Sequence, residues 1–136
     1  MDKVIGFTCG AFDLLHAGHI HFLTECSKRC DELVVGLHSN PQIDHSWKNK
    51  PIQSMYERYT QLKVYADYIV PYDTELDLEN MMATMPINKR FVGSEYENQE
   101  LTGQHMCDLL NIEIVYISRY HNYSSTELRN RLKDNT

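Results

Sequence analysis

Strand-like and helix-like segments alternate along almost the whole of this chain, and that alternation limits the folds open to it. Short runs rich in β-branched and aromatic residues predict strands at 3–9, 32–38, 67–72, 89–93 and 113–117. Apolar residues at helical spacing predict helices at 18–29, 54–65, 76–85 and 104–110, with a last helix from Ser124. This order predicts an α/β fold, a Rossmann-like five-stranded parallel sheet with helices on both faces.

Length and composition predict a soluble protein with a single domain over residues 1–136. Hydrophobic residues make up 42% and charged residues 24%, which is ordinary for a globular protein. No apolar run is long enough to span a bilayer, and the first residues enter a strand pattern rather than a signal peptide. We therefore expect a cytoplasmic protein with no membrane partner.

The formal net charge of −6 argues against nucleic acid as a partner. Proteins that bind nucleic acid broadly need a basic surface, which this balance does not supply. Small anionic substrates remain compatible with the charge, because they need only a local cluster of basic side chains and backbone N–H groups.

The four cysteines, Cys9, Cys26, Cys30 and Cys107, predict reduced, partly buried thiols rather than disulfides, because nothing marks the chain for secretion. Cys26 and Cys30 lie one helical turn apart, with His21 close by in sequence. A metal site there is the alternative, although this spacing lacks a complete zinc ligand set. We expect no metal bound directly by side chains of the protein.

Residues that suit phosphate binding follow four of the predicted strands. These segments lie at 16–19, 48–58, 93–95 and 119–126. Ligands of open parallel sheets bind beyond the carboxyl ends of the strands. We therefore expect the four segments to meet at one edge of the sheet.

Two histidines follow the first predicted strand and open the first predicted helix. His16 and His19, three residues apart, lie on nearly the same helical face, and Gly18 lets the backbone approach a ligand closely. The N–H groups and the dipole of a helix N-terminus favour anions. Two imidazoles there can donate to phosphate oxygens and stabilise charge developing at phosphorus. The motif therefore predicts nucleotide phosphate chemistry.

The end of the fifth predicted strand carries a second candidate anion site. Arg119 can bind phosphate with two parallel hydrogen bonds. Ser124, Ser125 and Thr126 supply hydroxyl and N–H groups at the start of the last helix. A plain helix cap, with Glu127 completing a capping box, is the alternative interpretation of these three residues.

Three stretches of the chain resemble signatures of one enzyme family. Residues 10–20, GAFDLLHAGHI, resemble the signature of the nucleotidyltransferase superfamily that carries an HxGH motif, most closely its cytidylyltransferase branch. Residues 119–126, RYHNYSST, are similar to the second signature, roughly RTxGISTT, and residues 48–58 to its basic loop and following helix. Over nearly the whole chain, the resemblance is greatest to the bacterial glycerol-3-phosphate cytidylyltransferases.

The resemblance implies transfer of a nucleoside monophosphate to a substrate phosphate with release of pyrophosphate. His16, His19, Lys48 and Arg119 would be the catalytic residues. The nucleotide would be bound by these two histidines and Arg119, together with Ala11, Phe12, Gly18, Lys50, Ser124, Ser125 and Thr126. Mg²⁺ would bind through triphosphate oxygens. The resemblance also implies a homodimer.

Asp13, Arg58 and Glu95 are the residues we expect at the acceptor. Asp13 would hold a neighbouring loop or a metal-bound water, or it would only cap a turn. Arg58 would contact the substrate phosphate or form a surface ion pair with Glu57 or Asp67. Lys48 and Lys50 both suit phosphate, and the sequence does not decide between them.

The main prediction is a CTP-dependent cytidylyltransferase acting on a phosphorylated small alcohol like glycerol 3-phosphate. One alternative is an ATP-dependent adenylyltransferase of the same fold, acting on a sugar phosphate or a flavin-type acceptor. Another is a nucleotide-binding module without turnover. The chain departs from the family pattern at Tyr120, at Asn122 and after Gly93, and we expect residues 96–103 to line the acceptor pocket.

Overall fold

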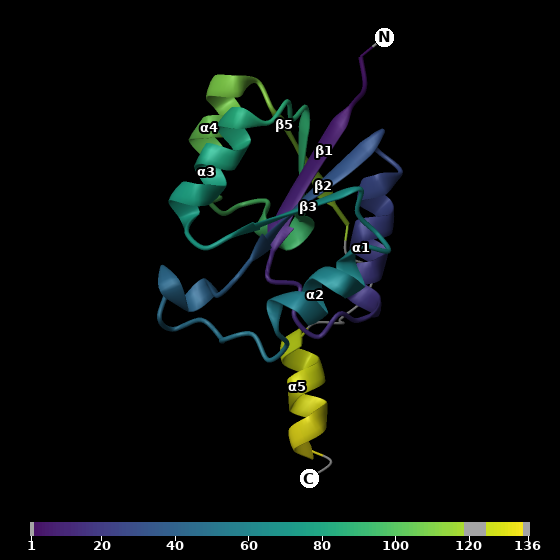
Figure 1. Cartoon of the computed structure of the whole chain (residues 1–136), viewed down its shortest axis with the longest axis vertical. Helices are drawn as coiled ribbons and strands as arrows, with labels where there is room; N and C mark the ends of the chain where they lie inside the picture. Colours follow the sequence, from purple (N-terminus) through teal and green to yellow (C-terminus); the bar gives the residue numbers. More distant parts are fainter. Residues whose placement is uncertain (1, 119–124, 135–136) are drawn as a thin grey trace.

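All five strands lie in one parallel sheet with the order β3-β2-β1-β4-β5 (Figure 1). The computed structural model describes residues 2–118 and 125–134. The strands are β1 Ile5–Gly10, β2 Glu32–His38, β3 Tyr68–Tyr72, β4 Lys89–Gly93 and β5 Glu113–Ile117. Each neighbouring pair runs parallel, which confirms the predicted sheet.

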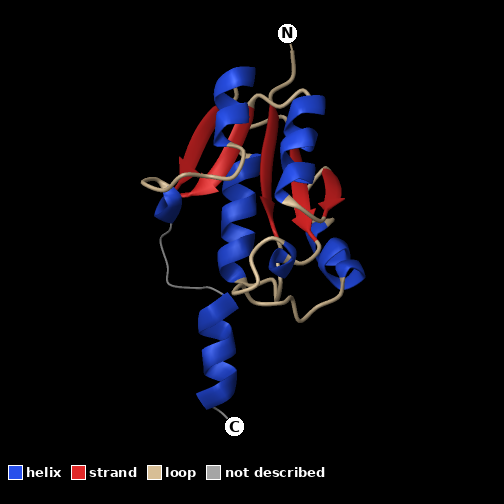
Figure 2. Cartoon of the chain, turned by 90° about the vertical axis from the view of Figure 1, so that its left-hand side faces the viewer, coloured by secondary structure: helices blue, strands red, loops and turns tan. Residues whose placement is uncertain are grey.

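Helices connect successive strands and cover both faces of the sheet (Figure 2). They are α1 Ala17–Ser27, α2 Met55–Leu62, α3 Glu75–Thr84, α4 Gln104–Leu110 and α5 Ser125–Asp134, with the 3₁₀ turns η1 Pro41–Ile43 and η2 Ser94–Tyr96. Within residues 2–118 and 125–134, none of the helices is long and apolar enough to cross a membrane.

The core has two halves, one on each face of the sheet. Along β2, Leu33 and Val35 pack with Leu23 of α1, whereas Val34 points the other way and packs with Leu78 of α3. This alternation follows from the two-residue period of a strand. Full burial of each such side chain contributes roughly 1.5–3 kcal/mol, so both helical layers are held by substantial apolar contact.

Local caps explain where two of the helices begin. Ser54 accepts from the backbone of Glu57 while the Glu57 carboxylate accepts from the Ser54 N–H, which forms a capping box at the start of α2. Thr74 and Asp77 form the same arrangement at α3, a cap that the sequence analysis did not single out. Helix α3 ends at Thr84, two residues before Pro86, because the residue that precedes a proline is disfavoured in the helical conformation.

The four cysteines are free thiols. Burial raises the pKa of the thiols of Cys26 and Cys30, and the Cys30 thiol donates to the carbonyl of Cys26 at 3.4 Å. Two such thiols are poor metal ligands, because a ligand must first lose its proton.

Arg58 joins the ends of β1 and β2 to the start of α2. Its guanidinium is only 2% exposed and donates to the carbonyls of Ala11 (3.1 Å), His38 (2.7 Å) and Ser39 (2.8 Å). Its Nε donates to the Gln53 carbonyl at 3.1 Å. The alternative surface ion pair is therefore wrong, because packing buries this side chain among backbone carbonyls. The expected contact with the substrate phosphate stays a prediction.

Replacing Arg58→Met should lower the free energy of unfolding by about 3 kcal/mol or more, because buried carbonyls lose a charged donor. Urea denaturation measures the loss. Arg29→Met is the matched control, since Arg29 forms an exposed pair with Glu25 that should be worth less than about 1 kcal/mol. Equal stability of the two variants would contradict the role given to Arg58.

Candidate active site

A cavity of about 660 Å³ lies at the carboxyl ends of the strands. It opens where the chain order reverses, between β1 and β4, because β2 and β3 lie on one side of β1 and β4 and β5 on the other. This reversal is where open α/β sheets leave a crevice for ligands. Three of the four expected segments, 16–19, 48–58 and 93–95, contribute residues to its lining. After β5 the lining includes Ser118, whereas most of the fourth segment, 119–126, lies outside the described residues.

The loop between β1 and α1 is held in a strained conformation. Phe12 and Leu14 have φ angles of 49° and 52°, in the left-handed region that side chains disfavour. Each such residue costs on the order of 1–3 kcal/mol, so the surroundings must impose the conformation. The Leu14 N–H donates to the side chain of Gln53 at 2.8 Å, which ties the loop to the residues before α2.

Asp13 supplies the second tie to those residues. Its carboxylate is 6% exposed and accepts from the N–H groups of Ile52 (2.8 Å) and Gln53 (2.9 Å). Arg129 of α5 donates to it at 2.6 Å. Asp13 therefore holds a neighbouring loop, which was one of the alternatives. It is not among the residues that line the cavity, and its expected substrate contact stays a prediction.

The two histidines together cap the N-terminus of α1. The N-cap residue His16 accepts from the Gly18 N–H through its Nδ1 at 3.0 Å. The Nδ1 of His19 accepts in turn from the His16 N–H at 3.2 Å, and the rings stack with centroids 3.9 Å apart. A ring nitrogen that accepts a hydrogen bond carries no proton, so each neutral ring carries its proton on Nε2. The cap thus fixes both rings as Nε2–H donors.

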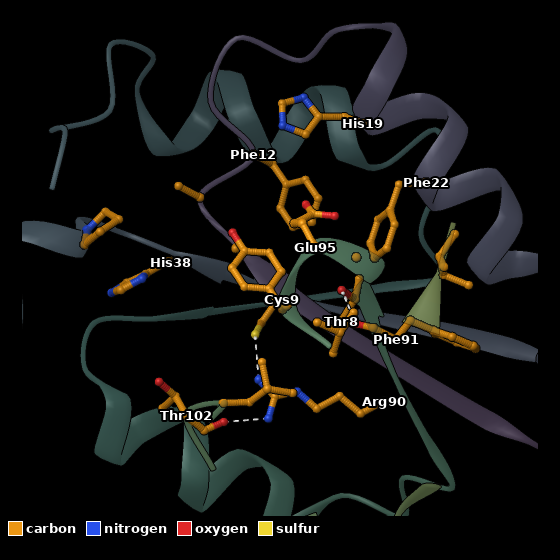
Figure 3. A pocket seen from close by; sticks show the side chains of 18 of the residues that line it. Thr8, Cys9, Phe12, His19, Phe22, His38, Arg90, Phe91, Glu95 and Thr102 are labelled. Carbon is orange, nitrogen blue, oxygen red and sulfur yellow. Dashed lines mark hydrogen bonds between the residues drawn. The ribbon is translucent and has the colours of Figure 1, made fainter. Parts of the chain in front are cut away.

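Five of the residues expected around the nucleotide line the cavity: Ala11, Phe12, His16, Gly18 and His19. Phe12 is buried, and its ring centroid lies 5.7 Å from that of His19. Figure 3 shows the two rings side by side at one end of the cavity. The strained loop therefore brings an aromatic surface and the histidine pair to the same place.

Of the two lysines that the sequence left open, Lys48 lines the cavity and Lys50 does not. One long-range contact and one local hydrogen bond position the Lys48 loop. His45 contacts the Glu75 carboxylate of α3 at 2.5 Å, and Gln42 donates to the Lys48 carbonyl at 2.9 Å.

The segment after β4 forms the opposite wall. Glu95 lines the cavity, as do five other residues of this segment: Tyr96, Gln99, Glu100, Leu101 and Thr102. This agrees with the expected lining by residues 96–103. A Cβ at Gly93 would lie 2.5 Å from Glu95 Oε2, so only glycine lets this carboxylate fold back over the strand end.

The second signature lies mostly outside the described residues. The structure does not describe residues 119–124, which include Arg119, Tyr120, Asn122 and Ser124. Ser125 and Thr126 belong to the first turn of α5, and their predicted contacts with nucleotide stay predictions.

Sequence analysis missed three features of the cavity wall. Arg90 of β4 lines the cavity although only 5% of its surface is exposed. His38 and Tyr72 stack with ring centroids 4.6 Å apart, and burial lowers the pKa of His38. Cys9 also lines the wall. Arg90 is the second residue of β4, and the pattern KRFVG does not by itself indicate that its side chain is buried.

A parallel sheet with a cavity at its switch point and an HxGH pair capping α1 defines the Rossmann-like nucleotidyltransferase fold. Comparison with known families agrees with this class. The chain belongs to the Cytidylyltransferase-like family, whose model matches residues 7–131.

Relatives by sequence include the bifunctional protein HldE of Nitrobacter hamburgensis, 32% identical over 130 residues, which are 93% of this chain and 26% of the relative. HldE of Campylobacter fetus subsp. fetus is 29% identical over 134 residues, 96% of this chain and 28% of the relative. The chain thus spans about a quarter of the length of these curated relatives.

Two solved structures are similar. A lipopolysaccharide core biosynthesis protein from Thermoplasma volcanium has a TM-score of 0.71 and 25% identity, covering 88% of this chain and 100% of that chain. The pantothenate synthetase of Thermus thermophilus has a TM-score of 0.62 at 14% identity, covering 94% of this chain and 64% of that chain. The second likeness shows a shared fold.

The cap function of His16 can be separated from its ring chemistry. His16→Asn should keep the stability of the protein, because asparagine is a strong N-cap, whereas His16→Ala should lose about 1 kcal/mol. Chemical denaturation of the two variants measures the difference. Equal losses in both variants would show that His16 does not cap α1 through its side chain.

Proposed function

We propose that this chain transfers the AMP moiety of ATP to a phosphorylated sugar and releases pyrophosphate. The observation that carries this proposal is the histidine pair at the N-terminus of α1, which lines a cavity at the sheet switch point and accepts backbone hydrogen bonds through both Nδ1 atoms. Donors fixed before the reaction stabilise charge that develops on phosphoryl oxygens.

The chemistry requires no covalent enzyme intermediate. An oxygen of the acceptor phosphate forms a bond to the α-phosphorus of the nucleotide, and the bond from that phosphorus to the bridging oxygen breaks, so that pyrophosphate leaves. His16 and His19 hold the phosphoryl oxygens. Lys48, from the segment between β2 and α2, contributes a positive charge to the same phosphates. The protein contributes positioning and electrostatic stabilisation, as in phosphoryl transfer generally.

Polar groups beyond β4 and at the start of α3 support a polyhydroxylated acceptor. The carboxylates of Glu75 and Glu100 line the cavity together with Thr102. Carboxylates accept hydrogen bonds from hydroxyl groups and suit a sugar better than an apolar acceptor. The similarity to a lipopolysaccharide core biosynthesis protein supports the same class, since lipopolysaccharide cores are built of sugars.

The relatives favour ATP over CTP as donor. The relatives reported above are named bifunctional protein HldE and lipopolysaccharide core biosynthesis protein, and neither name is that of a cytidylyltransferase. ATP-using members of the superfamily also carry the HxGH motif. The second candidate is transfer from CTP to a phosphorylated small alcohol, which the likeness of residues 10–20 and 119–126 to the cytidylyltransferase signatures supports.

Mg²⁺ fits this site as a partner of the triphosphate. Among residues 2–118 and 125–134, no group of three histidine, cysteine or acidic side chains is placed to hold a metal by itself. The cavity carboxylates Glu75 and Glu95 are oxygen donors, which Mg²⁺ prefers. When bound, the ion would neutralise charge on the triphosphate.

Pyrophosphate release with each of the four nucleoside triphosphates, tested against sugar phosphates and glycerol 3-phosphate, decides between the donors. We expect turnover with ATP and a sugar phosphate. Strict dependence on CTP would transfer the assignment to the second candidate. Nucleotide binding without turnover on any acceptor of the panel would overturn both and favour a module that only binds.

His16→Asn and His19→Asn should each lower kcat by on the order of 100-fold or more, because one prepositioned donor to the developing charge is lost. Circular dichroism confirms that the variants are folded. Wild-type turnover in either variant would contradict the catalytic role of that ring.

The two lysines provide a matched pair. Lys48→Met should lower kcat/KM by about 10-fold or more, because a charged contact to phosphate is lost, whereas Lys50→Met should change it by less than about 2-fold. Pyrophosphate release measures both. A larger effect at Lys50 than at Lys48 would show that the loop is placed differently in the complex.

A further inference from the structure

Arg90 brings a positive charge into the interior from the second position of β4. Its neighbour Phe91 packs with Leu23 of α1 on one face of the sheet. Since successive side chains of a strand point to opposite faces, Arg90 points to the face covered by α3 and α4. There its side chain is 5% exposed. Burial of a guanidinium is costly unless an anion or several acceptors compensate it.

The described residues compensate this charge only in part. Nη1 of Arg90 donates to the carbonyl of Thr102 at 2.5 Å, and Nη2 lies 3.8 Å from the Sγ of Cys9. Within residues 2–118 and 125–134, no carboxylate forms an ion pair with it. A guanidinium has five N–H donors, and the described residues engage two of them, so others can donate to a ligand in the cavity that Arg90 lines (Figure 3).

The walls around Arg90 strengthen the attraction for an anion. Tyr72, Leu78 and Thr102 line the same part of the cavity, and burial raises the pKa of the Tyr72 phenol, which therefore stays protonated and able to donate. The nearby Glu75 carboxylate is engaged by His45 and by the Thr102 hydroxyl (3.3 Å). In such a low-dielectric enclosure, a charge-assisted hydrogen bond is stronger than in water.

This place is separate from the histidine pair. The pair caps α1, which packs on the face opposite to α3 and α4. Figure 3 shows His19 and Arg90 at opposite ends of the cavity, with Phe12, Glu95 and Cys9 between them. A phosphate reacting beside His16 and His19 therefore leaves Arg90 available to another group of the same ligand.

We propose that Arg90 binds a second anionic group of the acceptor, a carboxylate or a phosphate distinct from the phosphate that reacts. The acceptor is then a sugar phosphate with negative charge at both ends, and Arg90 is the residue that selects it. This inference rests on the proposed function and adds the charge of the acceptor to it.

Three probes that share one phosphate test the selection by isothermal titration: glucose 1-phosphate, glucuronic acid 1-phosphate and glucose 1,6-bisphosphate. The wild-type protein should bind at least one of the two doubly anionic probes about 10- to 100-fold more tightly than glucose 1-phosphate, as expected for hydrogen bonds to a charged group. The stronger of those two probes identifies the group as carboxylate or phosphate. Arg90→Gln should abolish the preference.

Lys89→Gln removes the same charge from the adjacent residue of β4 and should leave the preference unchanged. Lys89 is the first residue of β4 and donates to the Arg29 carbonyl at 3.3 Å. It is not among the residues that line the cavity. Absence of a preference in the wild-type protein, or its persistence in Arg90→Gln, would overturn the inference. Pyrophosphate release from ATP is scored separately, so failure of the proposed function is recognised independently.

Thermal unfolding distinguishes selection from a structural role. Without ligand, Arg90→Gln should unfold at the same temperature as the wild type or higher, because a poorly compensated buried charge is removed. A large fall in melting temperature together with an unchanged preference would show that Arg90 only holds the Thr102 segment. If the glutamine variant does not fold, Arg90→Lys keeps the charge without the planar fork, and its preference should be weakened; a wild-type preference there would overturn the inference.

Discussion

The guanidinium of Arg58 is the contact on which the carboxyl edge of this sheet depends. It reaches the backbone after β1 at Ala11, the backbone at the end of β2 at His38, and the residues before α2 at Gln53. Burial lowers the pKa of the Arg58 guanidinium, and its attraction to the Asp13 carboxylate opposes that shift. The carboxylate therefore stabilises the buried positive charge. Three segments are thereby held at fixed spacing, and two of the residues that Arg58 contacts, Ala11 and His38, line the cavity.

The strained loop before α1 is a consequence of that framework. Residues such as Phe12 adopt a left-handed conformation only where the surroundings impose it, and the contacts of Asp13 and Gln53 with the neighbouring loop do so. The result is a helix whose first turn is capped by two imidazoles instead of by a hydroxyl or a carboxylate. In the function we propose, phosphate binding would use the Nε2 atoms of rings whose Nδ1 atoms cap α1, so the cap and the chemistry would not compete.

Local patterns predicted the architecture well, because they act over a few residues. The alternation of strands and helices, the capping box of Ser54 and the HxGH motif after β1 all depend on near neighbours. The two arginines show where such reasoning ends. Arg58 and Arg90 form hydrogen bonds with residues that lie 12 to 81 positions away in the sequence, and no local pattern predicts such contacts. The choice between Lys48 and Lys50 likewise depends on a contact between His45 and Glu75, 30 residues apart.

The central claim is that His16 and His19 accept backbone hydrogen bonds through Nδ1 and present Nε2–H to the phosphates. Long-range ¹H–¹⁵N correlation spectra of the histidine rings test it directly, because they distinguish the two neutral tautomers and the imidazolium. The account predicts the Nε2–H tautomer for both rings near neutral pH, with the Nε2 resonances moving when Mg²⁺ and a nucleoside triphosphate are added. An Nδ1–H tautomer for either ring, or Nε2 resonances indifferent to the nucleotide, would contradict it.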